Sequence, residues 1–553
     1  MLNAWKRAWL YLHTVRYLKP QQIFYRIWFR LTKPTIDESH ASAVRNKSGT
    51  FHSPARRSTS LLNAYTFYFL NQSGSLSTLG WVDTSEIASR SKLWRYNQHY
   101  FDDLNAMNAP ERSEWHFSLL EHWVSENEPG FGIGWDPYPT SLRIVKWIKW
   151  SYAGNELPAT CVQSLAVQVR FLMKRIELHI LGNHLFANAK ALIFAGLFFS
   201  GKEADQWLQR GLKIVSDELL EQVLADGGNF ERSPMYHAIF LEDLLDLINL
   251  AQAFPDVTSE VNVIHWREVA QSMLNWLNGM LHPDGEISFF NDAAIGIAPS
   301  PVELNTYAAR LGVSADIIPA RTTHFTDCGY IRLSSAKAVA LLDVAKVGPD
   351  YLPGHAHADT LSFELSLFCQ RVFVNGGTSQ YGTDAVRKIE RGTSAHNTVV
   401  INNENSSEVW GGFRVARRAY PRDLVINETP KLVSVTCSHD GYCRLSGRPT
   451  HRRRWDFSES SLTISDQITG DFDSAVAYFH VHPDVGMSAN SDSSWQLQLP
   501  KGQKITVTVE MGDSHLSPCF YAPEFGRRLK TQCLEVPLGQ EGARVTINWS
   551  SND

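Results

Sequence analysis

The stretch from Pro301 to Asp343, PVELNTYAARLGVSADIIPARTTHFTDCGYIRLSSAKAVALLD, contains the point at which the sequence changes its pattern. Before this stretch, apolar residues recur at intervals of three and four, which is typical of amphipathic helices. After it, apolar residues alternate or form short runs bounded by Gly, Asn and Asp, which is typical of antiparallel strands. We therefore expect a helical domain followed by a β domain, with the boundary between Pro301 and Phe325.

Short Gly, Pro or Asn breaks separate the helical segments, which favours antiparallel helical hairpins in a bundle or a closed toroid. The expected helices are 139–152, 161–180, 184–199, 203–223, 235–254 and 264–281. The expected strands are 330–333, 338–343, 361–367, 372–375, 397–401, 432–437, 461–468, 475–482 and 504–510. The predicted domains are an N-terminal helical and extended element (1–90), a helical domain (91–320) and a β domain (321–553).

The composition is that of an ordinary globular protein, with 553 residues, 43% hydrophobic and 20% charged. A formal net charge of −5 disfavours nucleic-acid binding as the main activity. The longest apolar run, 191–199, is well short of a membrane span, so we expect no transmembrane segment. The seven cysteines lack CxxC spacing, which argues against a zinc ribbon or a disulfide framework. The sequence contains no signal for an oligomeric state.

The first 34 residues mix aromatic side chains with Lys or Arg every few positions. They contain no clean apolar core and no small-residue cleavage site, so they do not read as a standard secretory signal. We expect a basic amphipathic helix here, either lying at a membrane surface or packed on the body of the protein.

Three histidines precede predicted strands in the second half of the chain. His355 and His357 lie in GHAHAD (354–359), and residues two apart in an extended segment point to the same side. They could offer two imidazoles to one metal, or one to a metal and one to a substrate. His396 precedes the next strand and Asn375 ends the strand between them, so a three-ligand site is possible. Alternatively, these histidines could simply lie at the surface, and the turn residues around them could have a purely structural role.

The helical half contains two further candidate clusters. In GNHL (182–185), Asn183 could bind a ligand or simply cap the helix that follows. In GGNFERSPMYH (227–237), Tyr236 lies beside His237 and Arg232 next to a Gly turn. This setting favours proton transfer by the tyrosine, although a buried helical tyrosine more often serves only as core.

Together these segments resemble the heparinase II/III-like polysaccharide lyases. The resemblance rests on the order and spacing of four motifs and covers the chain from about residue 90 to its C-terminus. The motifs are Asn183-His184, ERSPMYH (231–237), HAHAD (355–359) and RGTSAHNT (391–398). Two further segments, LWRYN (93–97) and GWDPYPTSLR (134–143), resemble a narrower branch that often accompanies bacterial surface-polysaccharide or capsule clusters.

This resemblance implies a multidomain α+β fold, with an N-terminal incomplete (α/α) toroid followed by a C-terminal antiparallel β-sandwich. It implies a carbon–oxygen lyase that cleaves an acidic, uronate-containing polysaccharide by metal-independent β-elimination, without an organic cofactor. It favours the bacterial cell envelope or periplasm as the location, and the absence of a standard signal leaves the cytoplasm open.

The resemblance also implies roles for individual residues. Asn183 would neutralise the uronate carboxylate with His184 beside it, Tyr236 would act as base, acid or both, and His355 would supply an imidazole. Tyr381 lies near the position of a second catalytic tyrosine. Residues for substrate binding would be Arg143, Glu231, Arg232 and Arg391. His357, Asn375 and His396 match the family's structural zinc positions, where the middle ligand is usually Asp; the uncharged Asn375 weakens that site.

Two other functions remain open from the sequence. The protein could be a non-catalytic glycan-binding or assembly factor of polysaccharide export. It could also be a glycoside hydrolase, which needs two carboxylates about 5–10 Å apart; Glu231 with Asp136 or Asp292 are the candidates.

Finally, the basic and aromatic segment 410–418 could shape a groove for a polyanionic sugar or form a solvated strand face.

Overall fold

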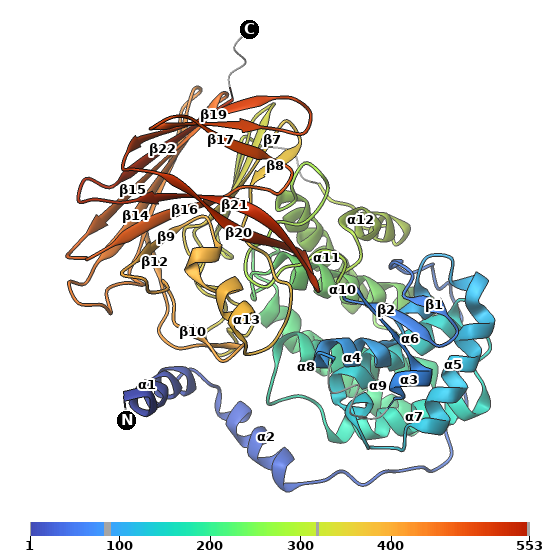
Figure 1. The fold of residues 1–553 in the computed structure, drawn as a ribbon. Helices are drawn as coiled ribbons and strands as arrows, with labels where there is room; N and C mark the ends of the chain where they lie inside the picture. The colour runs from blue at the N-terminus through green and yellow to red at the C-terminus, as the bar shows by residue number, and fades with distance from the viewer. Residues whose placement is uncertain (1, 82–89, 317–319, 550–553) are drawn as a thin grey trace.

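The computed structural model describes residues 2–81, 90–316 and 320–549 (Figure 1). Helices dominate the chain as far as Arg310, and strands dominate it from Thr322 onward. Residues 317–319, next to the expected domain boundary, lie outside the described residues, as do 82–89 at the end of the expected N-terminal element. None of the described helices combines the length and apolar character needed to cross a membrane.

The N-terminal region begins with two helices, α1 (Leu2–Val15) and α2 (Pro20–Leu31). An extended segment follows and runs along the helical domain, where Arg45 N–H donates to the carbonyl of Phe198 and Gly49 N–H to that of Ala253. A small antiparallel sheet and a short helix complete the region: β1 (Leu61–Asn63), β2 (Thr66–Phe69), β3 (Gln72–Ser75) and α3 (Leu76–Leu79).

The helical domain consists of successive helices joined by short connections. They are α4 (Lys92–Tyr100), α5 (Ser113–Glu126), α6 (Pro137–Tyr152), α7 (Ala159–Lys174), α8 (Gly182–Phe198), α9 (Lys202–Gln222), α10 (Pro234–Ala253), α11 (Glu260–Gly279) and α12 (Pro301–Arg310). Prolines at the first helical position begin α6, α10 and α12, where the missing N–H costs no hydrogen bond. The helix predicted over 161–180 ends at Lys174, because Asn188 of α8 accepts from the N–H of Glu177.

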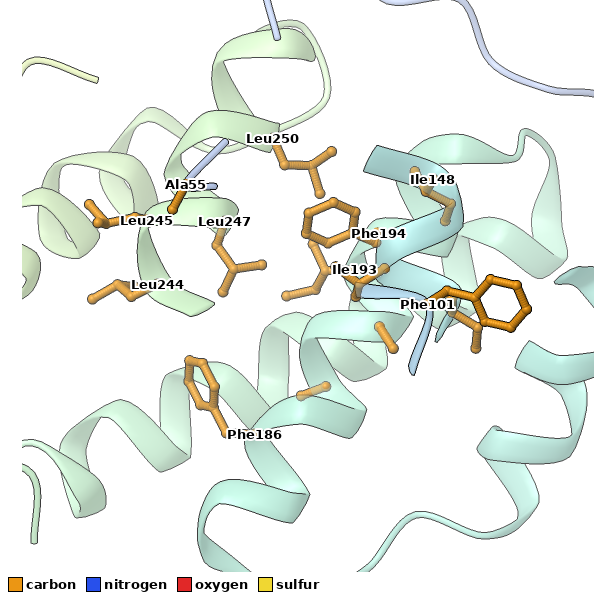
Figure 2. Close-up of a cluster of buried hydrophobic side chains, with 14 of the residues drawn as sticks. Ala55, Phe101, Ile148, Phe186, Ile193, Phe194, Leu244, Leu245, Leu247 and Leu250 are labelled. Atoms are coloured by element: carbon orange, nitrogen blue, oxygen red, sulfur yellow. The ribbon is translucent and has the colours of Figure 1, made fainter. Parts of the chain in front are cut away.

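The core of this domain forms around α8, which is almost entirely buried along its length. Ile193 and Phe194 of α8 lie near Leu247 and Leu250 of α10, as Figure 2 shows. The helix therefore packs on several sides, against α6, α9 and α10. Its amino-terminal end is thereby held in a fixed position.

Among the described residues, the β domain contains three large antiparallel sheets and one two-stranded sheet. An eight-stranded sheet has the order β12 (Pro421–Glu428), β13 (Val433–His439), β14 (Thr450–Phe457), β15 (Ser461–Thr469), β22 (Ala543–Asn548), β19 (Lys504–Met511), β18 (Ser494–Gln498) and β17 (Gly486–Ser491). A four-stranded sheet has the order β20 (His515–Glu524), β21 (Arg527–Pro537), β16 (Ala475–His480) and β9 (Val399–Ile401). A five-stranded sheet runs in chain order through β4 (Thr322–Phe325), β5 (Tyr330–Ser334), β6 (Ala338–Asp343), β7 (Phe363–Leu367) and β8 (Gln370–Phe373).

These sheets form two layers around one apolar core. Isolated bridges between Phe373 and Val481 and between Gly377 and Ala522 join the five-stranded sheet to the four-stranded sheet. Buried side chains of all three sheets meet in a single cluster. The strand β14 shows the expected alternation, with Arg452 and Arg454 exposed and His451, Arg453 and Trp455 buried.

Several segments of the β domain contact the helical domain, among them the long connection 344–362 between β6 and β7 and the segment from β8 to the helix α13 (Ala385–Glu390). The hairpin of β10 (Val409–Trp410) and β11 (Arg414–Val415) contacts α1. The backbone N–H of Asp292 donates to the carbonyl of His355 at 2.9 Å, which ties the first of these segments to the end of the helical domain.

Candidate active site

Tyr236, His355 and Tyr381 come together where the two domains meet. Tyr236 lies in the first turn of α10, where the side chain of Ser233 caps its backbone N–H. The Tyr236 ring stacks on the His355 ring with centroids 3.8 Å apart. The Tyr236 hydroxyl lies 2.9 Å from the Tyr381 hydroxyl. The structure thus gathers three of the predicted catalytic residues from three separate segments.

Asp292 holds the imidazole of His355. Its Oδ2 lies 3.0 Å from Nδ1 of His355, and its Oδ1 lies 2.8 Å from Nε2 of His357. Both oxygens also accept from Arg387, at 2.7 Å for Nη2 and Oδ2. Burial would raise the pKa of Asp292, but the charge of Arg387 and the two histidine hydrogen bonds outweigh it and hold the pKa well below its ordinary value. An anionic Asp292 favours the proton on Nδ1 of His355, which leaves Nε2 as the acceptor.

The two tyrosines keep their protons at neutral pH. Burial raises the pKa of Tyr236 well above 10, and its hydrogen bond with Tyr381 raises it further. Burial also raises the pKa of Tyr381, with the charge of Asp292 adding to the effect. Each hydroxyl is therefore a proton donor rather than a ready base.

Asn183 lies in the first turn of α8, and its backbone N–H lowers the pKa of the Glu231 carboxyl. The chain enters this helix through two left-handed residues, Leu181 (φ 72°) and Gly182 (φ 57°). A Cβ on Gly182 would lie 2.3 Å from the Leu352 side chain and 3.4 Å from that of Glu231, so Leu352 would have to shift to admit it. The N-cap position belongs to Leu181, and within the described part of the chain the half-buried Asn183 side chain has no hydrogen-bond partner. The capping alternative for Asn183 is wrong, and its amide is free to bind a ligand.

His184 adds positive charge to the same helix end. Its Nδ1 lies 3.1 Å from Oε1 of Glu177, and its ring packs on Tyr138 with centroids 4.3 Å apart. Burial lowers the pKa of His184, but the Glu177 carboxylate outweighs this and the net shift is upward. An imidazole with a raised pKa, a free amide and a helix amino terminus together form an arrangement that attracts a carboxylate.

Glu231 connects this anion site to His355. Its Oε2 lies 3.7 Å from Nε2 of His355, and its side chain is only 2% exposed. Burial raises the pKa of Glu231 more than His355 and His184 lower it. Glu231 therefore belongs to the cluster, but its carboxyl group is shielded from solvent.

Three arginines predicted to bind substrate do not do so. Arg143 is fully buried, donates to Gln168 and to the carbonyl of Gly134, and stacks on Trp123. Arg232 donates to the carbonyls of Cys328 and Lys346, which ties the β domain to the helical domain.

Arg391 donates to the carbonyls of Ala356 and Gly412, which holds the segment that carries His355. All three predictions were wrong because these guanidinium groups are buried in the interior, where carbonyl groups of distant segments need donors.

The predicted zinc residues form a pair rather than a three-ligand site. Nδ1 of His357 faces Nε2 of His396 at 3.0 Å, while Nδ1 of His396 bonds the carbonyl of Gly392. The amide of Asn375 accepts from the N–H of Asn397 and donates to the carbonyl of Phe289. Among the described residues, no three His, Cys, Asp or Glu side chains gather as a metal would require. The residues do not fit the expected three-donor zinc site, and Asp292 is the partner that His357 binds.

Two residues of the cluster were not predicted. Arg387 is buried against Asp292, and the sequence offers no sign of this beyond its place one helical turn before Arg391. Phe413 is 43% exposed, and its ring lies 5.1 Å from that of Tyr381 and 6.1 Å from that of His355. The basic and aromatic character of 410–418 did indicate that this segment could shape a groove beside the site.

Two family models match the sequence. "Heparinase II/III N-terminus" covers residues 151–309 and "Heparinase II/III-like, C-terminal" covers residues 318–550, together more than two thirds of the chain. A heparin-sulfate lyase of Bacteroides stercoris is 24% identical over an alignment of 365 residues that covers 59% of this chain and 50% of that protein. The chain thus spans about half the length of this curated relative.

Solved structures share the fold. The crystal structure of heparinase III has a TM-score of 0.66 at 19% identity, covering 83% of this chain and 77% of that one. The chondroitin AC lyase of Streptomyces coelicolor, solved with chondroitin sulphate, has a TM-score of 0.52 at 11% identity, covering 83% and 75%. The predicted fold class, an incomplete (α/α) toroid followed by an antiparallel β-sandwich, is confirmed.

Proposed function

The chain belongs to the heparinase II/III-like family, and we propose that it is a polysaccharide lyase that cleaves an acidic, uronate-containing polysaccharide by β-elimination. The observation that carries the proposal is the stacking of Tyr236 on His355, with the Tyr236 hydroxyl bonded to Tyr381 and the imidazole held by Asp292. The curated relatives are named heparin-sulfate lyases, which supports an acidic polysaccharide as the class of substrate.

The first step is neutralisation of the uronate carboxylate. The C5 proton is only weakly acidic, because its removal places negative charge on the adjacent carboxylate group. The free amide of Asn183, the His184 imidazole with its raised pKa and the amino terminus of α8 supply donors and positive potential for that group. Since these groups are fixed before substrate arrives, they stabilise the developing charge without reorganising.

The proton transfers divide between the imidazole and the tyrosines. Nε2 of His355 takes the C5 proton, because Asp292 holds the other ring proton on Nδ1. The C4–O4 bond breaks as a C4–C5 double bond forms, and Tyr236 gives its proton to the departing O4. Tyr381 hydrogen-bonds the same hydroxyl and holds Tyr236 in its protonated form until the transfer. Return of the proton from His355 to Tyr236 resets the site.

The hydrolase alternative lacks its carboxylates. Asp292 is fully buried and bound by Arg387, His355 and His357, so it has no access to a sugar ring or a water. Asp136 binds the hydroxyl of Tyr96 and pairs with Lys92. Asp292 therefore cannot face Glu231 across a glycosidic bond, as a hydrolase requires, and Asp136 is already held by Tyr96 and Lys92.

Product mass tests the proposal against both alternatives. Elimination yields chains whose new non-reducing end is lighter by one water than the end that hydrolysis leaves. We expect unsaturated products from at least one uronate polymer. Saturated products would indicate the hydrolase, and tight binding with intact chains would indicate the non-catalytic role.

We further propose a surface or capsular polysaccharide of the source bacterium as the substrate, acted on in the cell envelope or periplasm. The support is the likeness of segments 93–97 and 134–143 to the branch of the family that accompanies such gene clusters. A polymer panel that includes the organism's own exopolysaccharide tests the substrate, and fractionation of its cells tests the location.

A further inference from the structure

The helix α2 carries an apolar stripe that faces away from the protein. Ile23, Phe24, Ile27, Trp28 and Leu31 are each between 42% and 79% exposed. Their spacing places all five on one face, which in an ordinary surface helix would be buried in the core. Here the opposite face is the packed one.

Two contacts show that α2 is docked through this opposite face. Gln22 is buried and reaches the carbonyl of Tyr351, and the ring of Phe29 packs on His179. The exposed stripe is therefore not the contact by which the helix is held.

The helix α1 repeats this arrangement. Trp5, Trp9 and Leu12 lie on one face and are 76%, 49% and 60% exposed. On the other side of the helix, the ring of Tyr11 packs on Trp410 at 4.7 Å, and the hydroxyl of Thr14 accepts from the Trp410 indole at 3.1 Å. Both helices lie along one side of the molecule, as Figure 1 shows, and present an apolar stripe outward.

The charge of this segment differs from that of the remaining chain. The first 36 residues contain seven Lys or Arg and no Asp or Glu, whereas the whole chain carries a net charge of −5. Lys6 adjoins Trp5, and Arg30 and Lys33 lie on either side of Leu31. Cations therefore border both apolar stripes.

We propose that the outer face of α1 and α2 binds the surface of an anionic lipid membrane, with the stripes in the headgroup region and the cations on lipid phosphates. Interfacial helices combine apolar and aromatic side chains with Lys and Arg in this way. A polyanionic glycan would satisfy the cations but would not bury Leu12, Ile23 or Ile27. A second copy of the chain would bring two such positive segments face to face, which charge repulsion opposes.

The proposal also places the membrane beside the candidate active site. The helix α1 rests on the β10–β11 hairpin, whose Phe413 reaches Tyr381. The helix α2 rests on the β6–β7 connection through Gln22, which reaches Tyr351, and on the helical domain through Lys19, which pairs with Glu221. Lipid binding does not depend on the proposed lyase activity, so the two proposals can fail separately.

Co-sedimentation of the full chain with vesicles tests this proposal. We expect binding to phosphatidylcholine vesicles that contain about one third phosphatidylglycerol, and much weaker binding to phosphatidylcholine alone. The variant Ile27→Ser/Trp28→Ser should bind about a hundredfold less, since each large apolar side chain contributes at least about tenfold. Lys6→Gln/Arg30→Gln/Lys33→Gln should lose a similar factor on anionic vesicles only, at about fivefold for each cation.

The matched control is Val261→Ser/Val302→Ser, which removes two apolar side chains that are 74% and 69% exposed elsewhere. Its vesicle binding should equal that of the unmodified chain, and circular dichroism should show all variants folded. Absence of binding by the unmodified chain would overturn the proposal, as would an equal loss in the control. A dimer that Ile27→Ser/Trp28→Ser dissociates would assign the face to a second copy. Retention on an immobilised uronate polymer, without vesicle binding, would assign it to a glycan.

Discussion

The hydroxyl groups of Tyr236 and Tyr381 lie 2.9 Å apart, although 145 positions separate the two residues in the chain. One tyrosine comes from the first turn of a toroid helix and the other from the β domain. The contact therefore requires both domains in their observed positions, and it places a proton donor next to the ring of His355.

The variant Tyr236→Phe should lose turnover by about 10²–10⁴-fold, the range that general acid catalysis contributes. Its free energy of unfolding should fall by only about 1 kcal/mol, because one hydroxyl hydrogen bond is lost. Kinetics and denaturant unfolding measure the two effects. Tyr65→Phe is the control, since its hydroxyl bonds Ser118 outside the site. Full activity in Tyr236→Phe would remove this tyrosine from the mechanism.

The variant Glu177→Gln should narrow the pH range of tight substrate binding. The pKa of His184 is raised in the folded protein by Glu177, so the imidazole stays cationic to higher pH than an ordinary histidine. We expect KM to rise as pH increases through that pKa, and the rise should begin at lower pH in the variant. Glu203→Gln, which removes the partner of Arg170 in the same domain, should leave the KM profile unchanged.

The pair of His184 and Glu177 also predicts that the stability of the protein depends on pH. Because the folded-state pKa of His184 is raised, the stabilisation is fully present below the unfolded value of about 6.5 and is lost as pH rises through the folded value. The difference in unfolding free energy between the unmodified chain and Glu177→Gln should therefore shrink at alkaline pH. A difference that grows with pH would contradict the assignment.

The variant Gly182→Ala should lose both stability and substrate binding. The added Cβ would meet Leu352 at 2.3 Å and would also force a left-handed backbone on a residue with a side chain. Gly201→Ala is a matched control, since Gly201 precedes the next helix, also has a positive φ, and has open space around it. The control should show only backbone strain, of about 1–3 kcal/mol, because φ 92° and ψ 177° lie in a region that residues with a side chain rarely adopt. Equal thermal shifts in the two variants would contradict the steric argument.

Dialysis against a chelator should change neither the melting temperature nor the turnover. The reason is that Asn375 directs its amide to Asn397 and Phe289, which leaves His357 and His396 as a pair without a third donor. Loss of stability on chelation, restored by added zinc, would show that the site holds metal despite this geometry.

The sequence predicted the fold class and the core of the site because both depend on local signals. Helical and strand periodicities change on either side of the Pro301–Asp343 stretch, and the motifs around Asn183, Tyr236 and His355 are short and dense. The sharing of one partner by His355 and His357 also followed from their spacing, although the partner is the carboxylate of Asp292 rather than a metal.

The roles of the arginines could not be predicted in the same way. Arg143 and Arg391 differ from a substrate-binding arginine only in which distant carbonyl groups surround them. Arg387 pairs with Asp292 across 95 positions, and no local pattern marks either residue as the other's partner. The packing of the two domains determines which charges are buried and which distant charges pair. Helical and strand periodicity in the sequence does not reveal this packing.

The most direct test of the proposed elimination is ultraviolet absorbance during incubation with a panel of uronate polymers. Elimination leaves a C4–C5 double bond conjugated to the carboxylate, which absorbs in the ultraviolet, whereas hydrolysis leaves none. We expect absorbance to rise on at least one polymer, and to rise at least about a hundredfold more slowly with Tyr236→Phe. Shortening of a polymer by the unmodified chain without any rise in absorbance would contradict it.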